Sequence, residues 1–354
     1  MVTNKQLSSI IINAIIVKML LSFPRNIFVY CANSAWLAAI YSTAIAFGLF
    51  SILKKLYRTK DNVIGMADKV GGTTLRIITG LSVFVVIALG FISTLRVFPE
   101  VIRLVLLQKT YEEIISTVFV VATIFVAWCG IGAIARVHQF FLPIAGIIFG
   151  VFIIMLIPDI HGQNLLPIFG TGIKSITTDG LACISLFSDL LMLNVLIPEM
   201  KEADSYRKAG SRAIIIGGTC SIIIFFAYGL CYVYPVSSEF IIPVYQLERL
   251  INLSDFFSRL EAVFQFIWSI SIMLYSALYL AVLVEIWGQT FGLHHKKPLA
   301  APIIIALVGV CEIPNSLNET ILYDGIVNKW IYIPAFAIPL IIGVLFHVKH
   351  QKRI

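Results

Sequence analysis

The sequence is poor in charged residues and lacks the residue patterns that identify most enzymes. Only 13% of its 354 residues are Asp, Glu, Lys or Arg, against about 25% in a typical soluble domain. It contains no HExxH, GxSxG or phosphate-loop pattern, and its six histidines fall in loops or at the ends of apolar runs, without a paired carboxylate. We therefore expect no catalytic site and no resident metal or cofactor.

The cysteines and the basic residues also argue against common roles. No two of the six cysteines form a CxxC pair, and most lie in apolar runs, which is typical of small packing residues rather than of a metal site or disulfides. The formal net charge of +7 comes from basic residues spread over short loops. This distribution does not indicate a nucleic-acid-binding surface. The cysteines are Cys31, Cys129, Cys183, Cys220, Cys231 and Cys311.

Long apolar runs dominate the chain. Hydrophobic residues make up 59% of it, and the mean hydropathy is +0.95. Such a chain cannot cover its surface with polar groups in water, so we expect a lipid bilayer around it. A helix of about 20 apolar residues crosses a hydrocarbon core of about 30 Å. The sequence predicts a single all-α polytopic domain over residues 1–354, with transmembrane helices at about 7–30, 35–53, 76–97, 113–134, 139–158, 176–197, 210–234, 260–287, 299–312 and 330–347.

The distribution of Lys and Arg among the loops predicts the orientation of these ten helices, because cytoplasmic loops are enriched in both residues. With the N-terminus inside, 17 of the 26 Lys and Arg residues lie in inside segments and seven in outside segments, while Lys18 and Arg25 lie in the first span. Both termini are therefore predicted to be cytoplasmic. Two connections have the character of short interfacial helices, Asp61–Val70 inside and Pro243–Leu253 outside.

Ionisable residues deep within a span are costly unless they are partnered or hydrated, so they mark candidate functional positions. Lys18 lies near the middle of the first span, and Pro24 predicts a kink or break soon after it. Irregular backbone at such a break survives in a membrane where it lines a cavity. Asp189 is the only acid near the middle of a predicted span. We hypothesise that Lys18 and Asp189 face one central cavity, where they pair or bind the two charges of a zwitterion.

Alternatives remain open for these residues. Lys18 and Asp189 form a structural ion pair with no ligand, or Lys18 extends toward the inner membrane surface and never meets Asp189. In the eighth span, Tyr275 and Tyr279 are four residues apart and share one helical face. They provide a hydroxyl and an aromatic wall to a ligand, or they are packing residues. Helical spacing alone does not distinguish these roles.

Several stretches give the chain a family resemblance. They are LLSFPRNIF at 20–28, RVFPEVIRLVLLQKT at 96–110, LLPIFGTGI at 165–173, IPEM at 197–200 and DFFSRLEAVFQFIW at 255–268. With them the chain resembles the GerAB-like B subunits of spore germinant receptors, a branch of the amino acid–polyamine–organocation transporter superfamily. The most specific part is the combination of Arg259, Glu261 and Trp268.

The resemblance implies a LeuT-like inverted-repeat transporter fold of ten transmembrane helices, with helices 1 and 6 broken. It also implies a role in the spore inner membrane, where the chain binds a small germinant, such as an amino acid, and signals to partner A-type and C-type receptor subunits. In the family the pocket lies between helices one, three, six and eight. Carried over to this sequence, its residues are Val17, Lys18, Ser22, Phe23, Val86, Gly90, Ser188, Asp189, Tyr275 and Tyr279.

The chain departs from the family at one point. Family members often have a glycine-containing stretch before the Pro-Arg of the first helix, which frees backbone amides for a ligand carboxylate. Here the stretch is Val17-Lys18-Met19. Lys18 replaces the amides with a charged side chain, selects a different ligand or blocks the site. The second functional interpretation is a secondary transporter for an amino acid or a related cation.

Overall fold

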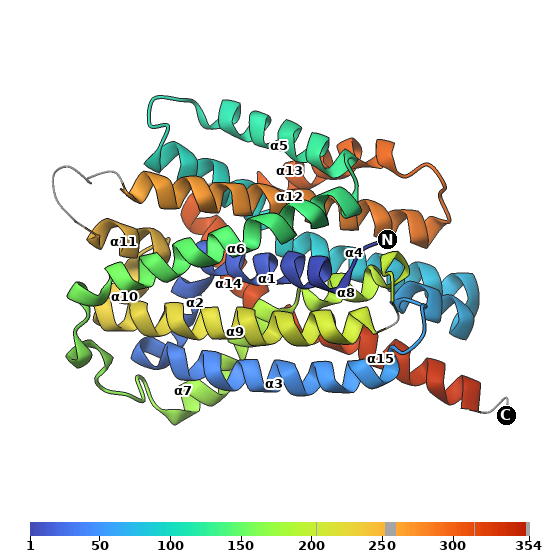
Figure 1. Cartoon of the computed structure of the whole chain (residues 1–354), viewed down its shortest axis with the longest axis horizontal. Coiled ribbons are helices and arrows are strands. Elements are labelled where there is room, and N and C mark those ends of the chain that lie inside the picture. Colours follow the sequence, from blue (N-terminus) through green and yellow to red (C-terminus); the bar gives the residue numbers. More distant parts are fainter. Residues whose placement is uncertain (203, 252–259, 315, 352–354) are drawn as a thin grey trace.

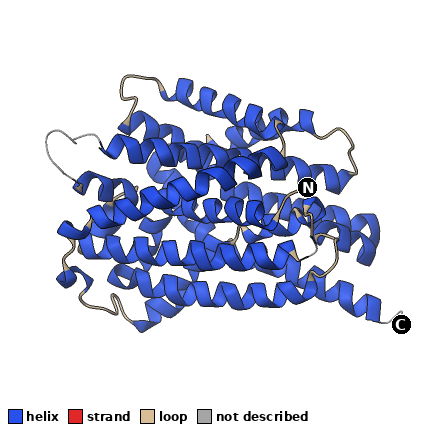
Figure 2. Ribbon diagram, viewed as in Figure 1, coloured by secondary structure: helices blue, strands red, loops and turns tan. Residues whose placement is uncertain are grey.

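The computed structural model describes residues 1–202, 204–251, 260–314 and 316–351. This described part is built of helices and turns and has no β-strand (Figure 2). Its α-helices are α1 (Asn4–Leu20), α2 (Phe23–Cys31), α3 (Ala35–Leu56), α4 (Val63–Val105), α5 (Glu112–Trp128), α6 (Ile131–Met155), α7 (Ile173–Thr178), α8 (Leu190–Val195), α9 (Ser205–Cys231), α10 (Val236–Glu239), α11 (Pro243–Leu250), α12 (Leu260–Phe291), α13 (Ala300–Cys311), α14 (Leu317–Trp330) and α15 (Tyr332–Gln351).

Helix α1 lies in the middle of the bundle. It starts at a capping box, in which the Thr3 hydroxyl accepts from the Gln6 backbone amide and the Gln6 side chain accepts from the Thr3 amide. Twelve of its seventeen residues are buried, as expected for a helix that is apolar on all sides. It packs against α9, α6 and α12 (Figure 1). The helix that carries Lys18 is therefore surrounded by protein rather than by lipid.

Seven helical segments in the described residues are long and apolar enough to cross a membrane. Helices α1 and α5 have 17 residues each and α13 has twelve, so they fall below that length. The chain is thus an all-helical, multi-pass membrane protein, and the count of ten crossings stays a prediction. The seven segments are Phe23–Leu56, Val63–Val105, Ile131–Met155, Ile173–Val195, Ser205–Cys231, Val263–Phe291 and Leu317–Lys349.

Two predicted spans are interrupted in the structure. Helix α1 ends at Leu20 and α2 begins at Phe23, so Leu21 and Ser22 stand between two helices. Pro24 is the second residue of α2, where its missing amide costs no helical hydrogen bond. Further along, α7 and α8 are separated by a 3-10 segment, η4 (Asp179–Phe187). At the second interruption the Ser185 carbonyl accepts a hydrogen bond from a side chain, that of Lys18.

Helical segments are present where the sequence predicts two short interfacial helices, and their position at the membrane surface stays a prediction. The first of them is the start of α4, which begins at Val63 and is capped by the Asn62 side chain, an acceptor for the Gly65 amide. A kink at Gly72 separates these first turns from the rest of α4. Gly72 has a φ of 68°, which favours glycine. The second predicted segment, residues 243–253, contains helix α11, and its last two residues lie outside the described residues.

The predicted connection after the ninth span is wrong. Residues between 312 and 330 were expected to form an outer loop, but Leu317–Trp330 is helix α14, which packs against α4 and η4. Its sequence, LNETILYDGIVNKW, is too polar to read as a span. The helix is stable because it buries its polar face against protein, with Thr320 and Asp324 among the buried residues.

The boundary between the fourth and fifth predicted spans is also wrong. Gly130, with a φ of 84°, ends the turn after α5, and α6 begins at Ile131. Arg136 and His138 therefore lie within α6 rather than in a loop. His138 is only 1% exposed. Arg136 and His138 were interpreted as loop residues because they are ionisable, but the chain leaves the helical conformation at Gly130.

The N-terminus and the end of α15 lie at the same end of the bundle (Figure 1). Two backbone hydrogen bonds hold the N-terminus there. The Val2 amide donates to the Glu199 carbonyl at 2.8 Å, and the Lys201 amide donates to the Val2 carbonyl at 3.1 Å. The connections predicted to be inside, such as those after α3 and α12, lie at this end too. Which side of the membrane this end faces stays a prediction.

Candidate functional site

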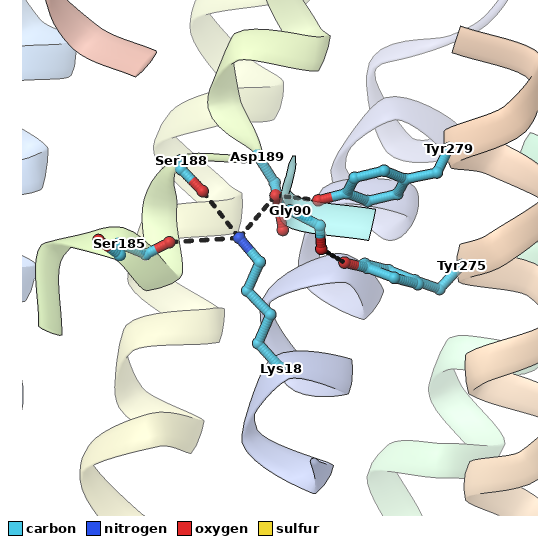
Figure 3. Close-up of polar contacts among 7 residues, drawn as sticks. All are labelled: Lys18, Gly90, Ser185, Ser188, Asp189, Tyr275 and Tyr279. Carbon is cyan, nitrogen blue, oxygen red and sulfur yellow. Dashed lines mark hydrogen bonds and ion pairs between the residues drawn. The ribbon is translucent and has the colours of Figure 1, made fainter. Parts of the chain in front are cut away.

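Lys18 lies in the last turn of α1, next to the interruption, and its side chain points into the bundle (Figure 3). Its ammonium group has three donors. It donates to Asp189 Oδ1 at 2.7 Å, to Ser188 Oγ at 2.8 Å and to the Ser185 carbonyl at 3.2 Å. All three acceptors come from the segment around the end of η4 and the start of α8. The lysine therefore joins the two interrupted segments.

Asp189 is the residue directly before α8, and it is 3% exposed. Its Oδ1 accepts from Lys18 and also from the Tyr279 hydroxyl of α12 (Figure 3). Its Oδ2 is buried and accepts no hydrogen bond from the described residues. The predicted pairing of Lys18 with Asp189 is thus confirmed, and the alternative in which the two never meet is wrong.

Tyrosines of α12 and the backbone of α4 form the neighbouring wall. The Tyr275 hydroxyl donates to the Gly90 carbonyl at 3.3 Å, and the Tyr275 and Tyr279 rings have centroids 4.3 Å apart. Phe91 packs on Tyr279 at 5.3 Å. A β-carbon at Gly90 would lie 3.5 Å from the Tyr279 hydroxyl. The absence of a side chain at Gly90 thus leaves room beside both hydroxyl groups.

A second buried carboxylate, Asp324 of α14, lies at the same site. The Ser22 hydroxyl donates to Asp324 Oδ2 at 2.8 Å across the interruption between α1 and α2. Asp324, which lies between two predicted spans, was not among the predicted site residues. Asp324 was missed because α14 was read as a loop. An N-cap serine, Ser316, three residues before Glu319 is the signal that identifies the helix.

A small cavity of about 20 Å³ lies between these groups. That volume holds the centre of about one water molecule. Five predicted site residues line it, and the other lining residues are Leu21, Ser93, Thr94, Asp324 and Asn328. The five are Lys18, Ser22, Phe23, Gly90 and Tyr275. In this arrangement of the helices the space between these residues is therefore too small for a molecule larger than water.

The other five predicted residues are placed as follows. Ser188, Asp189 and Tyr279 are joined to the cavity through the hydrogen bonds of Lys18 and Asp189. Val17 and Val86 are buried apolar residues that belong to the hydrophobic core and do not line this cavity. The most specific part of the family resemblance is described only in part. Arg259 and the Glu261 side chain lie outside the described residues, and Trp268 is buried.

A second buried polar cluster, at Asn13 of α1, was not predicted. The Asn13 amide donates to the Ser271 carbonyl at 3.0 Å, and it lies 3.3 Å from Nε2 of His138. Nδ1 of His138 lies 2.8 Å from the Ile134 carbonyl, so a proton on Nδ1 satisfies both contacts. The cluster connects α1, α6 and α12. The signal in the sequence is Asn13, an amide in the middle of an apolar run.

The chemistry of the site is that of charge and hydrogen bonding. It holds one ammonium group, two carboxylates and several hydroxyl groups within a bundle of apolar helices. Among the described residues no group of three or more His, Cys, Asp or Glu side chains is arranged to hold a metal ion. Such a site is suited to binding a small charged molecule.

The two tyrosines are expected to make different contributions to stability, because their hydroxyl groups donate to different acceptors. Hydrogen bonds to charged groups are worth about 1.5–3 kcal/mol and those to neutral groups about 0.5–1.5 kcal/mol. We therefore expect Tyr279→Phe, which removes a donor to Asp189, to lower the melting temperature of the purified protein more than Tyr275→Phe, which removes a donor to the Gly90 carbonyl. Tyr275→Phe is the matched control. Equal losses would contradict a special role for the Tyr279 hydroxyl.

Comparison with known proteins identifies relatives that are all described as spore germination proteins. A family model described as spore germination protein matches residues 1–320. The spore germination protein YndE of Bacillus subtilis (strain 168) is 24% identical over 370 residues, which span 99% of this chain and 97% of that protein. Spore germination protein A2 of the same organism is 23% identical over 260 residues, 73% of this chain and 70% of that protein. YfkT, also from this organism, is 26% identical over 233 residues and is covered over 63% of its length.

The fold is similar to that of a solved transporter. The structure of Mhp1, a nucleobase-cation-symport-1 family transporter in a closed conformation with bromovinylhydantoin bound, superposes with a TM-score of 0.65. The match covers 100% of this chain and 93% of Mhp1 at 13% sequence identity. At this identity the likeness concerns the fold alone, which is a transporter-like helical fold of the LeuT kind.

Proposed function

The chain belongs to the spore germination protein family, and from this premise we propose that it is the germinant-sensing membrane subunit of a spore germination receptor. In this proposal the chain is one membrane domain with ten crossings and cytoplasmic termini in the spore inner membrane. The interruptions between α1 and α2, and between α7 and α8, are the broken helices 1 and 6 of a LeuT-like inverted repeat. The chain binds a small nutrient and is not an enzyme.

The buried pair of Lys18 and Asp189 is the observation that carries the proposal. Their side chains are 8% and 3% exposed. A buried ion pair is a weak source of stability, because well-packed apolar residues in its place are often neutral or stabilising by about 1–4 kcal/mol. Ionisable residues within a membrane bundle more often mark a substrate path or site. This pair lies beside a cavity and between two interrupted segments, where opening the bundle would expose it.

Signalling follows from a change in the arrangement of the helices. The cavity of about 20 Å³ is too small for a nutrient, so binding requires a more open arrangement. A ligand that prefers the open arrangement increases its population. We propose that A-type and C-type receptor subunits respond to this change. The pair of Lys18 and Asp189 then acts as a contact that stabilises the closed arrangement.

A thermal-shift screen of the purified full-length protein tests the proposal. The panel consists of amino acids, sugars and nucleosides. A ligand that binds only the folded protein stabilises it by about 2.7 kcal/mol at a concentration of 100 times its Kd, so we expect one class to raise the melting temperature in a saturable manner. The variant with Lys18→Met and Asp189→Leu is expected to lose this shift. A panel without effect on the wild-type protein, or an unchanged shift in the variant, contradicts the proposal.

A secondary transporter for an amino acid or related cation is the second candidate. The observation in its favour is the likeness of the fold to Mhp1, which is a transporter. Uptake into proteoliposomes separates the two functions. Accumulation of the screened ligand that follows an imposed ion gradient supports transport. Binding without accumulation supports sensing.

A further inference from the structure

Asp324 is a buried carboxylate without a cation. It is 7% exposed, and no Lys, Arg or His among the described residues lies within ion-pair distance of it. Its carboxylate accepts from the Ser22 hydroxyl at 2.8 Å, and the side chains of Ser93 and Asn328 also form hydrogen bonds with it. Burying an ionised carboxylate is costly unless it is paired and hydrogen-bonded. Asp324 therefore has hydrogen-bond donors but, among the described residues, no cation in direct contact with it.

The cations nearby are already engaged. Lys18 lines the same cavity, but its three donors go to Asp189, Ser188 and Ser185. Lys329, on the same helix as Asp324, pairs with Asp179 at 2.9 Å. Because each lysine already has its own partners, neither forms an ion pair with Asp324, and Lys18 acts on its charge only from a distance.

Arg96 is engaged as well. It pairs with Glu312 at 2.8 Å and with Glu112 at 3.1 Å. The side chains that line the small cavity carry one positive charge, on Lys18, and one negative charge, on Asp324, and the positive charge is held by Asp189. Counting Asp189, the cluster has an excess of one negative charge. This balance favours a cationic ligand and leaves no free cation for a ligand carboxylate.

Asp324 lies between two cavities. It and Ser93 line the small cavity of about 20 Å³, and both also line a larger one of about 250 Å³ between α4, α13 and α14. Most of the larger cavity is apolar. Its apolar lining includes Leu89, Ile92, Val310, Ile313, Pro314 and Val327. Arg96, which is paired with Glu112 and Glu312, also lines this cavity. Asp324 is thus the acidic group of a mostly apolar chamber.

We propose that this chamber binds a primary ammonium ion carried on a compact apolar body. The ammonium group donates to Asp324 and to the hydroxyl oxygens beside it, and the apolar body fills the space between α4, α13 and α14. This proposal rests on the proposed function and specifies its ligand class, a small apolar amine rather than a zwitterion. It also gives a reason for the Val17-Lys18-Met19 stretch, because Lys18 satisfies Asp189 internally and no ligand carboxylate is needed.

Three matched probes test the ligand class without any mutation. Pentylamine carries the proposed ammonium group, 1-pentanol has the same apolar body without charge, and norleucine is pentylamine with an added carboxylate. Binding to the purified full-length protein is measured by calorimetry at pH 7. We expect pentylamine to bind more tightly than either of the others. Binding of 1-pentanol as tight as that of pentylamine, or tighter binding of norleucine, overturns the proposal. Millimolar sodium or potassium chloride that displaces pentylamine more strongly than the same concentration of choline chloride also overturns it, because the site would then bind a metal cation.

A substitution then assigns the binding to Asp324. Asp324→Asn keeps the shape of the side chain and removes its charge, and we expect it to weaken pentylamine binding at least about 30-fold, since it removes one partner of a buried charge pair. Asp179→Asn is the matched control, because it removes a carboxylate next to α14 that lines neither cavity. An unchanged affinity in Asp324→Asn overturns the proposal.

The two proposals fail in different ways. If norleucine binds tightly and its binding depends on Lys18 and Asp189, the amine site is contradicted and the proposal of nutrient sensing is still supported. Pentylamine binding that depends on Asp324, with no germination response to any amine or nutrient, supports the site and contradicts the receptor function.

Discussion

Replacing Lys18 with methionine is expected to destabilise the protein by about 3–5 kcal/mol, because it leaves Asp189 buried without its cation. Asp189 is 3% exposed, and its Oδ2 already lacks a hydrogen bond from the described residues. Lys18→Met also leaves Ser188 and the Ser185 carbonyl without their donor. The loss of stability is measured as the change in the free energy of unfolding between wild type and variant in the same detergent. Where unfolding is irreversible, the melting temperatures of the two proteins are compared instead.

A double-mutant cycle separates the cost of the unpaired charge from the contribution of the pair. Asp189→Leu alone leaves the Lys18 ammonium buried and is expected to cost a similar amount. Lys18→Met with Asp189→Leu removes both charges, so its loss is expected to be much smaller than the sum of the two single losses. Additive losses would show that the two side chains do not depend on each other and would contradict the geometry in Figure 3.

The second large effect is expected at Gly210, where α9 meets α3. A β-carbon there would lie 2.1 Å from Cζ of Phe50 and within 2.7 Å of both neighbouring ring carbons. Phe50 is fully buried and packs on Tyr206 at 5.2 Å, so its ring has little freedom to move. We expect Gly210→Ala to destabilise the protein by about 1–3 kcal/mol through overpacking, measured by thermal unfolding.

Two further variants control this prediction. Gly48→Ala is the same substitution at an exposed position of α3 with no atom within 4 Å of the added carbon, and it is expected to be neutral or stabilising by up to about 1 kcal/mol. Phe50→Leu shortens the opposing side chain, so it is expected to recover part of the stability of Gly210→Ala. A Gly210→Ala variant as stable as the wild-type protein would contradict the close packing of α3 and α9.

The ion pair was predictable because membrane physics makes buried charge rare. Lys18 and Asp189 stand out in apolar runs, and placing two oppositely charged residues in one bundle suggests that they meet. The break near Pro24 was predictable for a similar reason, since proline cannot continue a helix without losing a hydrogen bond. These signals are local, and they need no knowledge of the packing.

The role of Asp324 was not predictable by the same reasoning. Helix α14 is polar by composition, and hydropathy assigns such a segment to a loop. It is helical because its polar residues find partners on other elements, as with Ser22 for Asp324 and Asp179 for Lys329. Those partners are distant in the sequence, so only the assembled bundle reveals them.

His138 illustrates a second limit. An ionisable residue near the end of an apolar run reads as a loop residue, but a neutral imidazole is buried without a large cost once both of its nitrogens have partners. In the structure those partners are Asn13 and the Ile134 carbonyl. The sequence indicates that Asn13 is unusual, and it does not indicate which helix provides the group beside it.

The most direct test of the account is the germination response of spores in which the variant with Lys18→Met and Asp189→Leu replaces the native chain. The spores are exposed to the nutrient or amine that stabilises the purified wild-type protein, and the amount of variant in the spore membrane is measured by immunoblotting. We predict that the variant is present at the wild-type amount and that the response is lost. A full response at that amount would show that the buried pair has no part in sensing.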